Sequence, residues 1–216
     1  MSGGQPLIGQ PLSGQTLSGQ TLILASTSAS RARLLADAGV AVDIVPSRVD
    51  EDEVKQSLLA EGATPRDVAG TLAELKAVRV SAQAPGALVI GADQVLALGE
   101  SMLDKPASMV EARGHLQRLR GASHRLVSAV VVALDGRRIW AAQDEAELAM
   151  RWLSDAFIDD YLARVGDRAL QSVGAYQLEG LGAQLFSRIR GDYFTILGLP
   201  LLPLLGFLRD RGVLME

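Results

Sequence analysis

One stretch near the start of the chain, residues 21–35, constrains the fold and the chemistry more than any other. A short apolar run of strand length leads through a cluster of hydroxyl side chains into a helical pattern that Gly39 would end. The N-terminus of a helix exposes unpaired N–H groups and the positive end of the helix dipole. Ser26, Ser28 and Arg31 would add hydroxyl donors and a forked cation there. The stretch therefore indicates a phosphate-binding loop between a strand and a helix, with a serine N-cap on an ordinary helix as the alternative.

The composition narrows the class of protein. The chain has 216 residues, a length that fits one domain or one domain with two lobes. It has no cysteine and only two histidines, which argues against a disulfide framework and against a thiolate or histidine metal cage. A net charge of -4 without a basic arm argues against nucleic-acid binding.

The hydropathy pattern argues against a membrane protein. The longest apolar stretch, residues 196–208, is interrupted by Pro200 and Pro203 and is too short to cross a bilayer, so we expect it to be buried core. No basic start followed by an apolar segment marks a signal peptide. We therefore expect a soluble, cytoplasmic protein that contacts neither membrane nor nucleic acid.

The first twenty residues differ in composition from the rest of the chain. They repeat a short unit of the type Gln-Pro-Leu-Ser-Gly and contain no charged side chain. So short a repeat has too little apolar surface to form a core. We therefore expect residues 1–20 to be a flexible low-complexity tail and residues 21–216 to be one domain.

The remaining pattern predicts an α/β fold. Strands alternate with helices in the first half, and a long hairpin that turns at Asp135 and Gly136 dominates the second half. This pattern favours a mixed twisted sheet with flanking helices and a ligand-binding cleft between two lobes. Helix N-caps are expected at Thr64, Ser108 and Ser154. We expect strands at residues 40–46, 86–98, 124–134 and 137–150, an irregular glycine-rich segment at 166–191, and a helix at 204–211.

Several charged residues stand in or beside apolar segments. Asp93 lies between two apolar parts of the strand predicted at residues 86–98, and a buried carboxylate is costly unless it is paired or bound to a metal. Lys76 lies beside the apolar face of a helix, and Lys105 lies in a loop. The acids at 50–53 form either a solvated helix start or a source of metal-binding carboxylates.

The ordered series of these motifs resembles the Maf family of nucleoside triphosphate pyrophosphatases from about Leu22 to the C-terminus. The order of the motifs over most of the chain makes this resemblance specific. The matching segments are residues 24–31 with 34–35, 49–51, 75–77, 91–95, 105–106, 123–124, 174–176, 191–193 and 198–200.

The resemblance implies a fold, an activity and partners. It implies a two-lobed hydrolase of the Maf and ITPase-like kind that cleaves nucleoside triphosphates between the α- and β-phosphates, giving a monophosphate and pyrophosphate. It also implies a divalent metal, Mg²⁺ or Mn²⁺, a homodimer, and a role in clearing modified or non-standard nucleotides. The alternative is a non-catalytic nucleotide-binding regulator of cell division, because some members have been linked to division.

The resemblance also assigns roles by position. Asp93, Glu51 and Lys76 would be catalytic, with Asp93 as the proton acceptor and with Glu51 and Asp93 as hard oxygen ligands for the metal. Positioning and charge neutralisation are what phosphoryl chemistry chiefly requires, and this set would supply both. The residues assigned to phosphate binding are Ser26, Ser28, Arg31 and Lys105.

Departures from the family pattern bear on which nucleotide base the protein prefers. Members that act on dTTP and UTP tend to have threonine and glutamine where this chain has Gln94 and Glu179. We hypothesise that these two residues favour a 7-methyl-GTP-like substrate over dTTP and UTP, because a carboxylate can accept from both N–H groups on one edge of guanine. Asp104 stands where the family has glycine. Tyr176 and Phe186 would either stack on a base or pack in the core.

Overall fold

The structure is a computed structural model that describes residues 19–215. The predicted tail falls almost wholly on residues 1–18, which lie outside this part, so the tail and the domain boundary stay predictions. Within residues 19–215, the strands form one seven-stranded mixed sheet in the order β2-β1-β3-β5-β6-β7, with β4 paired to β3. The strands are β1 (Leu22–Leu24), β2 (Asp43–Ile44), β3 (Leu88–Leu98), β4 (Ser101–Leu103), β5 (Ser123–Leu134), β6 (Arg137–Met150) and β7 (Phe186–Arg190).

The direction of the strands changes at β3. Strand β1 runs parallel to both β2 and β3, whereas β3, β5, β6 and β7 pair antiparallel in succession. The α-helices of the described chain are α1 (Ala29–Asp37), α2 (Glu51–Ala60), α3 (Pro65–Ser81), α4 (Met109–Leu119), α5 (Asp155–Val165), α6 (Tyr193–Ile196) and α7 (Leu201–Asp210). Three short 3-10 helices follow α5, at Gly166–Gln171, Val173–Ala175 and Leu181–Leu185.

The helices begin where local capping predicts. Ser28, Thr64, Ser108 and Ser154 each accept a hydrogen bond from the backbone N–H three residues later. This bond satisfies one of the orphan donors of the first helical turn. At Thr64 the reciprocal bond from its own N–H to Asp67 completes a capping box. The N-caps predicted at Thr64, Ser108 and Ser154 are confirmed, and the serine that caps the first helix is Ser28.

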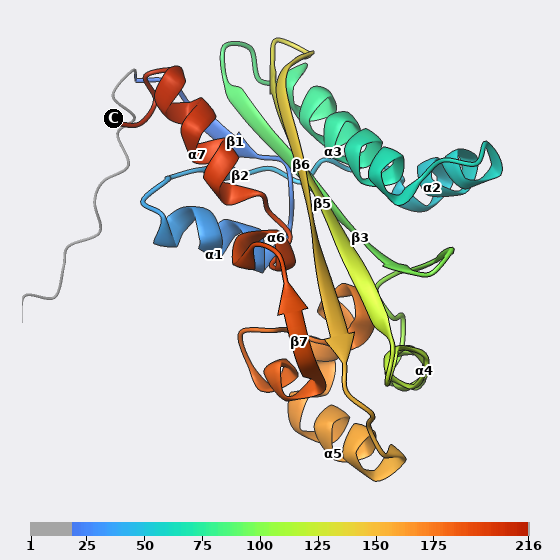
Figure 1. Cartoon of the computed structure of the whole chain (residues 1–216). Coiled ribbons are helices and arrows are strands. Elements are labelled where there is room, and N and C mark those ends of the chain that lie inside the picture. The colour runs from blue at the N-terminus through green and yellow to red at the C-terminus, as the bar shows by residue number, and fades with distance from the viewer. Residues whose placement is uncertain (1–18, 216) are drawn as a thin grey trace, which may run out of the picture.

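Both faces of the sheet are covered, as Figure 1 shows. Val130 and Val132 of β5 belong to a buried cluster that includes side chains of α1 and α7. Ala129 and Val131, which alternate with them, belong to a cluster with α3 on the opposite face. The predicted α/β fold, a mixed sheet with flanking helices, is confirmed.

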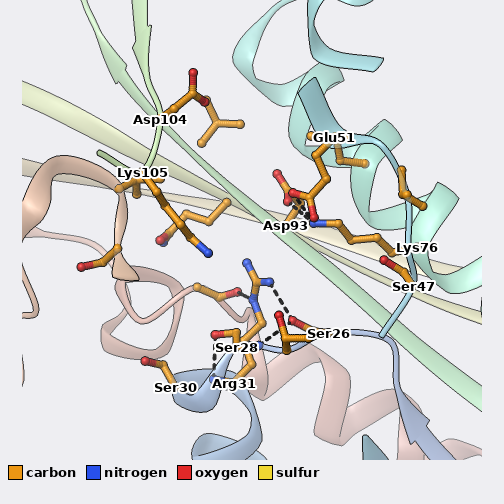
Figure 2. A pocket seen from close by; sticks show the side chains of 18 of the residues that line it. Ser26, Ser28, Ser30, Arg31, Ser47, Glu51, Lys76, Asp93, Asp104 and Lys105 are labelled. Carbon is orange, nitrogen blue, oxygen red and sulfur yellow. Dashed lines mark hydrogen bonds and ion pairs between the residues drawn. The ribbon is translucent and has the colours of Figure 1, made fainter. Parts of the chain in front are cut away.

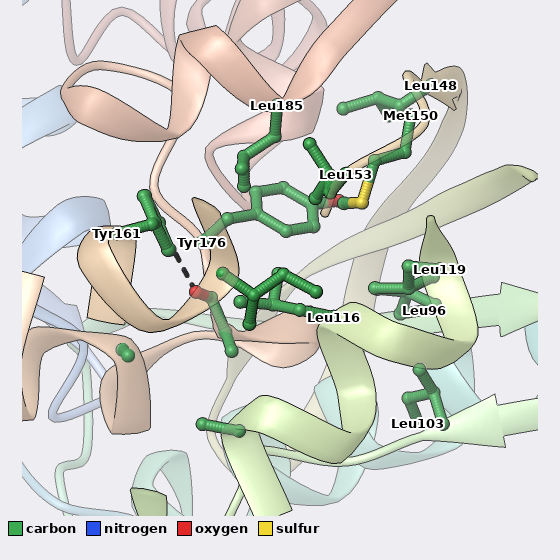
Figure 3. Close-up of a cluster of buried hydrophobic side chains, with 14 of the residues drawn as sticks. Leu96, Leu103, Leu116, Leu119, Leu148, Met150, Leu153, Tyr161, Tyr176 and Leu185 are labelled. Carbon is green, nitrogen blue, oxygen red and sulfur yellow. Dashed lines mark hydrogen bonds between the residues drawn. The ribbon is translucent and has the colours of Figure 1, made fainter. Parts of the chain in front are cut away.

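A further core lies at the other end of the long strands, where Figure 1 places α4 and α5. Leu116, Ile158 and Tyr176 are buried in it, and Figure 3 shows Leu116 and Tyr176 among their neighbours. Phe186 packs against the same cluster, with its ring centroid 4.9 Å from that of Tyr176. Tyr176 and Phe186 therefore pack in this core, which is one of the two roles expected for them.

The glycine-rich segment 166–191 is less irregular than predicted. It contains the 3-10 helices and the edge strand β7, which pairs with β6. The strand predicted at 40–46 is wrong in length, because only Asp43 and Ile44 pair with the three-residue β1. The last helix begins at Leu201 and not at 204.

The apolar stretch 196–208 is core, as its sequence indicates. Half-exposed side chains alternate with buried ones along it, and no helix in residues 19–215 has the length and apolar character needed to cross a membrane. The buried members of the stretch are Ile196, Leu199, Leu201, Leu204, Phe207 and Leu208.

Candidate active site

A cavity of about 450 Å³ lies beyond the carboxyl end of β1. Strand β1 ends at Leu24, whereas its neighbour β3 continues to Leu98, so the middle of β3 is left open to the cavity. Ligands of α/β sheets commonly bind at such strand ends, where the connections diverge. The wall is formed by the loop before α1, the start of α2, one face of α3, the loop after β4, and residues 171–173 and 197–198.

The loop between β1 and α1 presents hydroxyl groups and a guanidinium to the cavity (Figure 2). Ser28 caps α1, and Ser26 Oγ accepts hydrogen bonds from the Ser28 N–H and from Arg31 Nη1. Both oxygens act here as acceptors, so each hydroxyl proton stays available as a donor to an anion. Arg31 Nε also donates to the Gly198 carbonyl at 2.8 Å, which fixes the guanidinium against the loop before α7.

Helix α3 and strand β3 contribute a buried ion pair. Lys76 Nζ lies 2.7 Å from Asp93 Oδ1, and both side chains are buried. Gly91 makes this approach possible, because a Cβ there would lie 2.3 Å from the Ala73 carbonyl oxygen and 2.6 Å from the Ala77 nitrogen. Asp93 and Gly91 point to the same face of β3, so the lysine of the helix meets the aspartate of the strand.

The start of α2 brings a second carboxylate to the same ammonium. Glu51 Oε2 lies 2.8 Å from Lys76 Nζ, and the Glu51 side chain is half exposed. Figure 2 shows the Glu51 and Asp93 carboxylates close together at the lysine head group. One cation therefore holds two acids from elements far apart in the sequence.

Burial shifts the proton affinities of the cavity residues. Burial raises the pKa of Asp93, and the positive charges of Lys76 and Arg31 oppose this rise. Burial also lowers the pKa of Lys105, helped by the charge of Arg31, while Glu51 opposes the shift. The pKa of Arg31 is lowered by burial as well. Burial thus disfavours the charged forms of Lys105 and Arg31, and a bound anion would stabilise these charges.

The donor set fits a divalent metal that also binds its substrate. Glu51 and Asp93 supply hard carboxylate oxygens at one point, and Mg²⁺ is commonly held by one or two carboxylates together with substrate phosphates and water. No group of three or more histidine, cysteine or acidic side chains in the described chain is arranged to hold a metal by itself. The residues present therefore fit an ion that a phosphate ligand completes.

The structure brings together every residue to which sequence reasoning gave a catalytic, metal or phosphate role. All seven line this one cavity: Ser26, Ser28, Arg31, Glu51, Lys76, Asp93 and Lys105. Their roles stay proposals, since the cavity lining establishes proximity and not chemistry.

The two residues considered for base selectivity lie differently. Gln94 lines the cavity, but its side-chain N–H₂ group lies 3.0 Å from each of the Thr195 and Ile196 carbonyl oxygens and from Ser128 Oγ. Its donors are therefore engaged with the protein. Glu179 is exposed and is not among the cavity-lining residues. A base read by Glu179 would have to extend beyond this lining.

Sequence reasoning missed a second ion pair at the cavity. Lys55 of α2 pairs with Asp104 in the loop after β4, and both line the cavity. One signal for Lys55 was present, because it lies four residues after Glu51 and so on the same face of a helix. The partnership with Asp104 joins distant segments, and no local pattern indicates it.

His124 has no part in the cavity. Its Nε2 lies 2.6 Å from the Tyr176 hydroxyl, and burial lowers its pKa to about 4. The ring is therefore neutral at neutral pH and packs beside Tyr176 and Phe186 in the core near α4 and α5.

Comparison with known proteins places the chain among relatives. A nucleoside triphosphate pyrophosphatase of Paramagnetospirillum magneticum is 55% identical over 193 residues, which cover 89% of this chain and 100% of that protein. One of Caulobacter vibrioides is 56% identical over 191 residues, 88% of this chain and 96% of that protein. A 7-methyl-GTP pyrophosphatase of Rhizobium etli is 51% identical over 193 residues, 89% of this chain and 97% of that protein. A family model described as Maf-like protein matches residues 21–211, and the chain therefore belongs to the Maf family.

Proposed function

We propose that this chain is a metal-dependent nucleoside triphosphate pyrophosphatase, which releases a nucleoside monophosphate and pyrophosphate. The observation that carries the proposal is the meeting, in one cavity, of the hydroxyl loop and Arg31 with the buried Lys76–Asp93 pair. Relatives between 51% and 56% identical are named pyrophosphatases of nucleoside triphosphates or of 7-methyl-GTP, which supports the same reaction.

Different residues of the cavity have different proposed roles in the reaction. Ser26, Ser28, Arg31 and Lys105 would bind and neutralise the phosphates, with the hydroxyl and guanidinium donors directed from the start of α1. Glu51 and Asp93 would hold the divalent metal, which supplies positive charge to the phosphate oxygens. Charge neutralisation and positioning are the main demands of phosphoryl transfer.

Asp93 is the candidate general base. It would orient a water molecule and accept one of its protons as the water oxygen bonds to the α-phosphorus and the α–β bridging oxygen leaves with pyrophosphate. Burial raises the pKa of Asp93, and a carboxylate with a raised pKa is a stronger base than an exposed one. Lys76 would hold this carboxylate in position through the bond from its ammonium.

The proposed substrate class is a modified or non-standard nucleotide, with 7-methyl-GTP favoured over dTTP and UTP. The names of relatives such as that of Rhizobium etli support this preference. Gln94 supports it little, because its amide donors are engaged with Thr195 and Ile196. Glu179 stays a proposed base reader. Comparison of kcat/KM for 7-methyl-GTP, GTP, dTTP and UTP between wild type and Glu179→Gln tests this role. An unchanged ranking would remove Glu179 from the account.

A direct assay tests the activity. Purified protein is mixed with Mg²⁺ or Mn²⁺ and a panel of 7-methyl-GTP, GTP, dTTP and UTP, and pyrophosphate and monophosphate are measured together. The proposal expects equal amounts of the two products and no release without metal. A protein that binds these nucleotides and releases neither product would instead be the non-catalytic regulator.

The proposal also covers the oligomeric state of the protein and its location in the cell. A homodimer is implied by the family resemblance, and sedimentation of the purified chain measures it. We assign the reaction to the cytoplasm, where the nucleoside triphosphate pools lie, without a nucleic-acid or membrane partner. Fractionation of cells that carry the tagged chain tests this assignment.

A further inference from the structure

Helix α2 is attached to the molecule unlike the other α-helices of residues 19–215, because none of its residues is buried. Val54 and Leu58 are partly buried against the cluster that includes α3, and Figure 1 shows α2 at the margin of the molecule beyond α3. The residues that flank it, Arg48 and Gly62, have φ of 52° and 79°. Such backbone is uncommon for a non-glycine residue and marks a sharp change of direction. Because α2 makes so few apolar contacts, its position depends on the contacts of its polar side chains.

Two ion pairs attach this helix to the rim of the cavity. Glu51, in its first turn, contacts Lys76 of α3, and Lys55, one turn later, contacts Asp104 in the loop that also carries Lys105. Residues four apart share a face of a helix, so Glu51 and Lys55 both face the cavity. The Lys55 side chain is 12% exposed, whereas that of Asp104 is 65% exposed. Lys55 therefore reaches across to the loop from a mostly covered position.

We propose that the Lys55–Asp104 pair is a clasp that holds α2 against the loop after β4 and thereby positions Glu51 at the metal-binding point. Lys55 and Asp104 are positioning residues that act through α2. The inference rests on the proposed function, since it deepens the role of Glu51 there.

A different role for the same pair makes the opposite prediction. If Lys55 bound a phosphate directly, Asp104 would compete for its charge, and removing that carboxylate would tighten nucleotide binding. If the pair is a clasp, Lys55 and Asp104 form a single contact, so removal of either side chain weakens the attachment of α2 in the same way. The sign of the Asp104→Asn effect therefore separates the two roles.

The first experiment measures KM for Mg²⁺ and for the nucleotide in Lys55→Met, Asp104→Asn and the double variant. The clasp predicts that KM for Mg²⁺ rises about two- to fivefold in each, as is typical for the loss of a partly exposed ion pair. It predicts a smaller change in kcat and near-normal values for Lys55→Arg. The KM for Mg²⁺ of the double variant should be no higher than that of the more impaired single variant, because both substitutions remove the same contact. A lower nucleotide KM in Asp104→Asn would overturn the proposal.

The second experiment needs no activity. Amide hydrogen exchange is followed in the protein without metal or nucleotide, and the clasp predicts faster exchange at residues 51–60 in Lys55→Met and Asp104→Asn, with α3 unchanged. Arg33→Met is the matched control, because Arg33 pairs with Asp37 on the exposed face of α1 and does not line the cavity. Unchanged exchange of α2 in both variants would contradict the clasp. An inactive wild type with faster exchange in both variants would instead contradict the proposed function and leave the clasp standing.

Discussion

The cavity joins two regions that are held in different ways. On one side, α3 and β3 approach so closely that Gly91 has no room for a Cβ, and they bury Lys76 and Asp93 between them. On the other side, α2 buries no residue and contacts the cavity through Glu51 and Lys55. Packed backbone fixes the first region, and side-chain charge fixes the second. The proposed general base, Asp93, therefore belongs to the rigid region, and the proposed metal ligand Glu51 belongs to the adjustable one.

The largest expected effect comes from the rigid region. Asp93→Asn keeps the size of the side chain but removes the base, so kcat should fall by about a thousandfold, within the range typical for a lost general base and its charge. The fold should persist, because Lys76 keeps Glu51 as a partner. Pyrophosphate release at saturating metal and a melting curve check this. Near-normal release would show that the rigid region does not supply the base.

The close approach of α3 and β3 makes the second prediction. In Gly91→Ala the new Cβ would meet the Ala73 carbonyl and Ala77 backbone, so the free energy of unfolding should fall by about 2–3 kcal/mol, as in other overpacked cores. Gly114→Ala in α4 is the control, since nothing lies within 4 Å of its Cβ position. It should stabilise by about 0.5–1 kcal/mol, the usual gain from alanine in a helix. Equal urea midpoints for the two variants would contradict the tight packing.

The pH profile tests the environment of Asp93. Burial raises the pKa of this carboxyl, and the proposed mechanism needs its ionised form. Activity should therefore fall by about tenfold per pH unit below that raised pKa, and the acid limb should begin at a higher pH than an exposed aspartate would give. The dependence of kcat/KM on pH in wild type measures this, because kcat/KM reports ionisations of the free enzyme. An acid limb at the ordinary aspartate pKa would mean that the base is solvated.

The smallest effect is expected from the segment outside both regions. Residues 1–20 are uncharged and glycine-rich, and the match to the family begins at residue 21. Deletion of residues 2–20 should leave kcat, KM and the melting temperature unchanged. A marked fall in any of them would show that this segment supports one side of the cavity.

The parts of the fold that sequence predicted are those that local chemistry determines. The N-caps at Thr64, Ser108 and Ser154 each need only a side chain and a backbone N–H three residues away. Strand β7 was missed because its burial pattern is mostly exposed, and only pairing with β6 makes it a strand. A short edge strand of this kind carries no periodic signal.

The same division applies to the candidate site. The residues that carry charge or hydroxyl groups were found because such groups are conspicuous beside apolar runs, as Asp93 is in β3. The carbonyl of Gly198, which fixes Arg31, and the partnership of Lys55 with Asp104 depend on segments that meet only in the folded chain. The hydrogen bonds of Gln94 could not be predicted for a related reason, because its amide donors face carbonyls of α6 that no local pattern indicates.

The position of a labelled oxygen tests the central claim most directly. Wild-type protein, Mg²⁺ and 7-methyl-GTP or GTP are incubated in ¹⁸O-enriched water, and the products are analysed by mass spectrometry. The account predicts a single ¹⁸O atom in the phosphate of the nucleoside monophosphate and none in the pyrophosphate, because water attacks the α-phosphorus. Label in pyrophosphate, or release of orthophosphate in place of pyrophosphate, would contradict it.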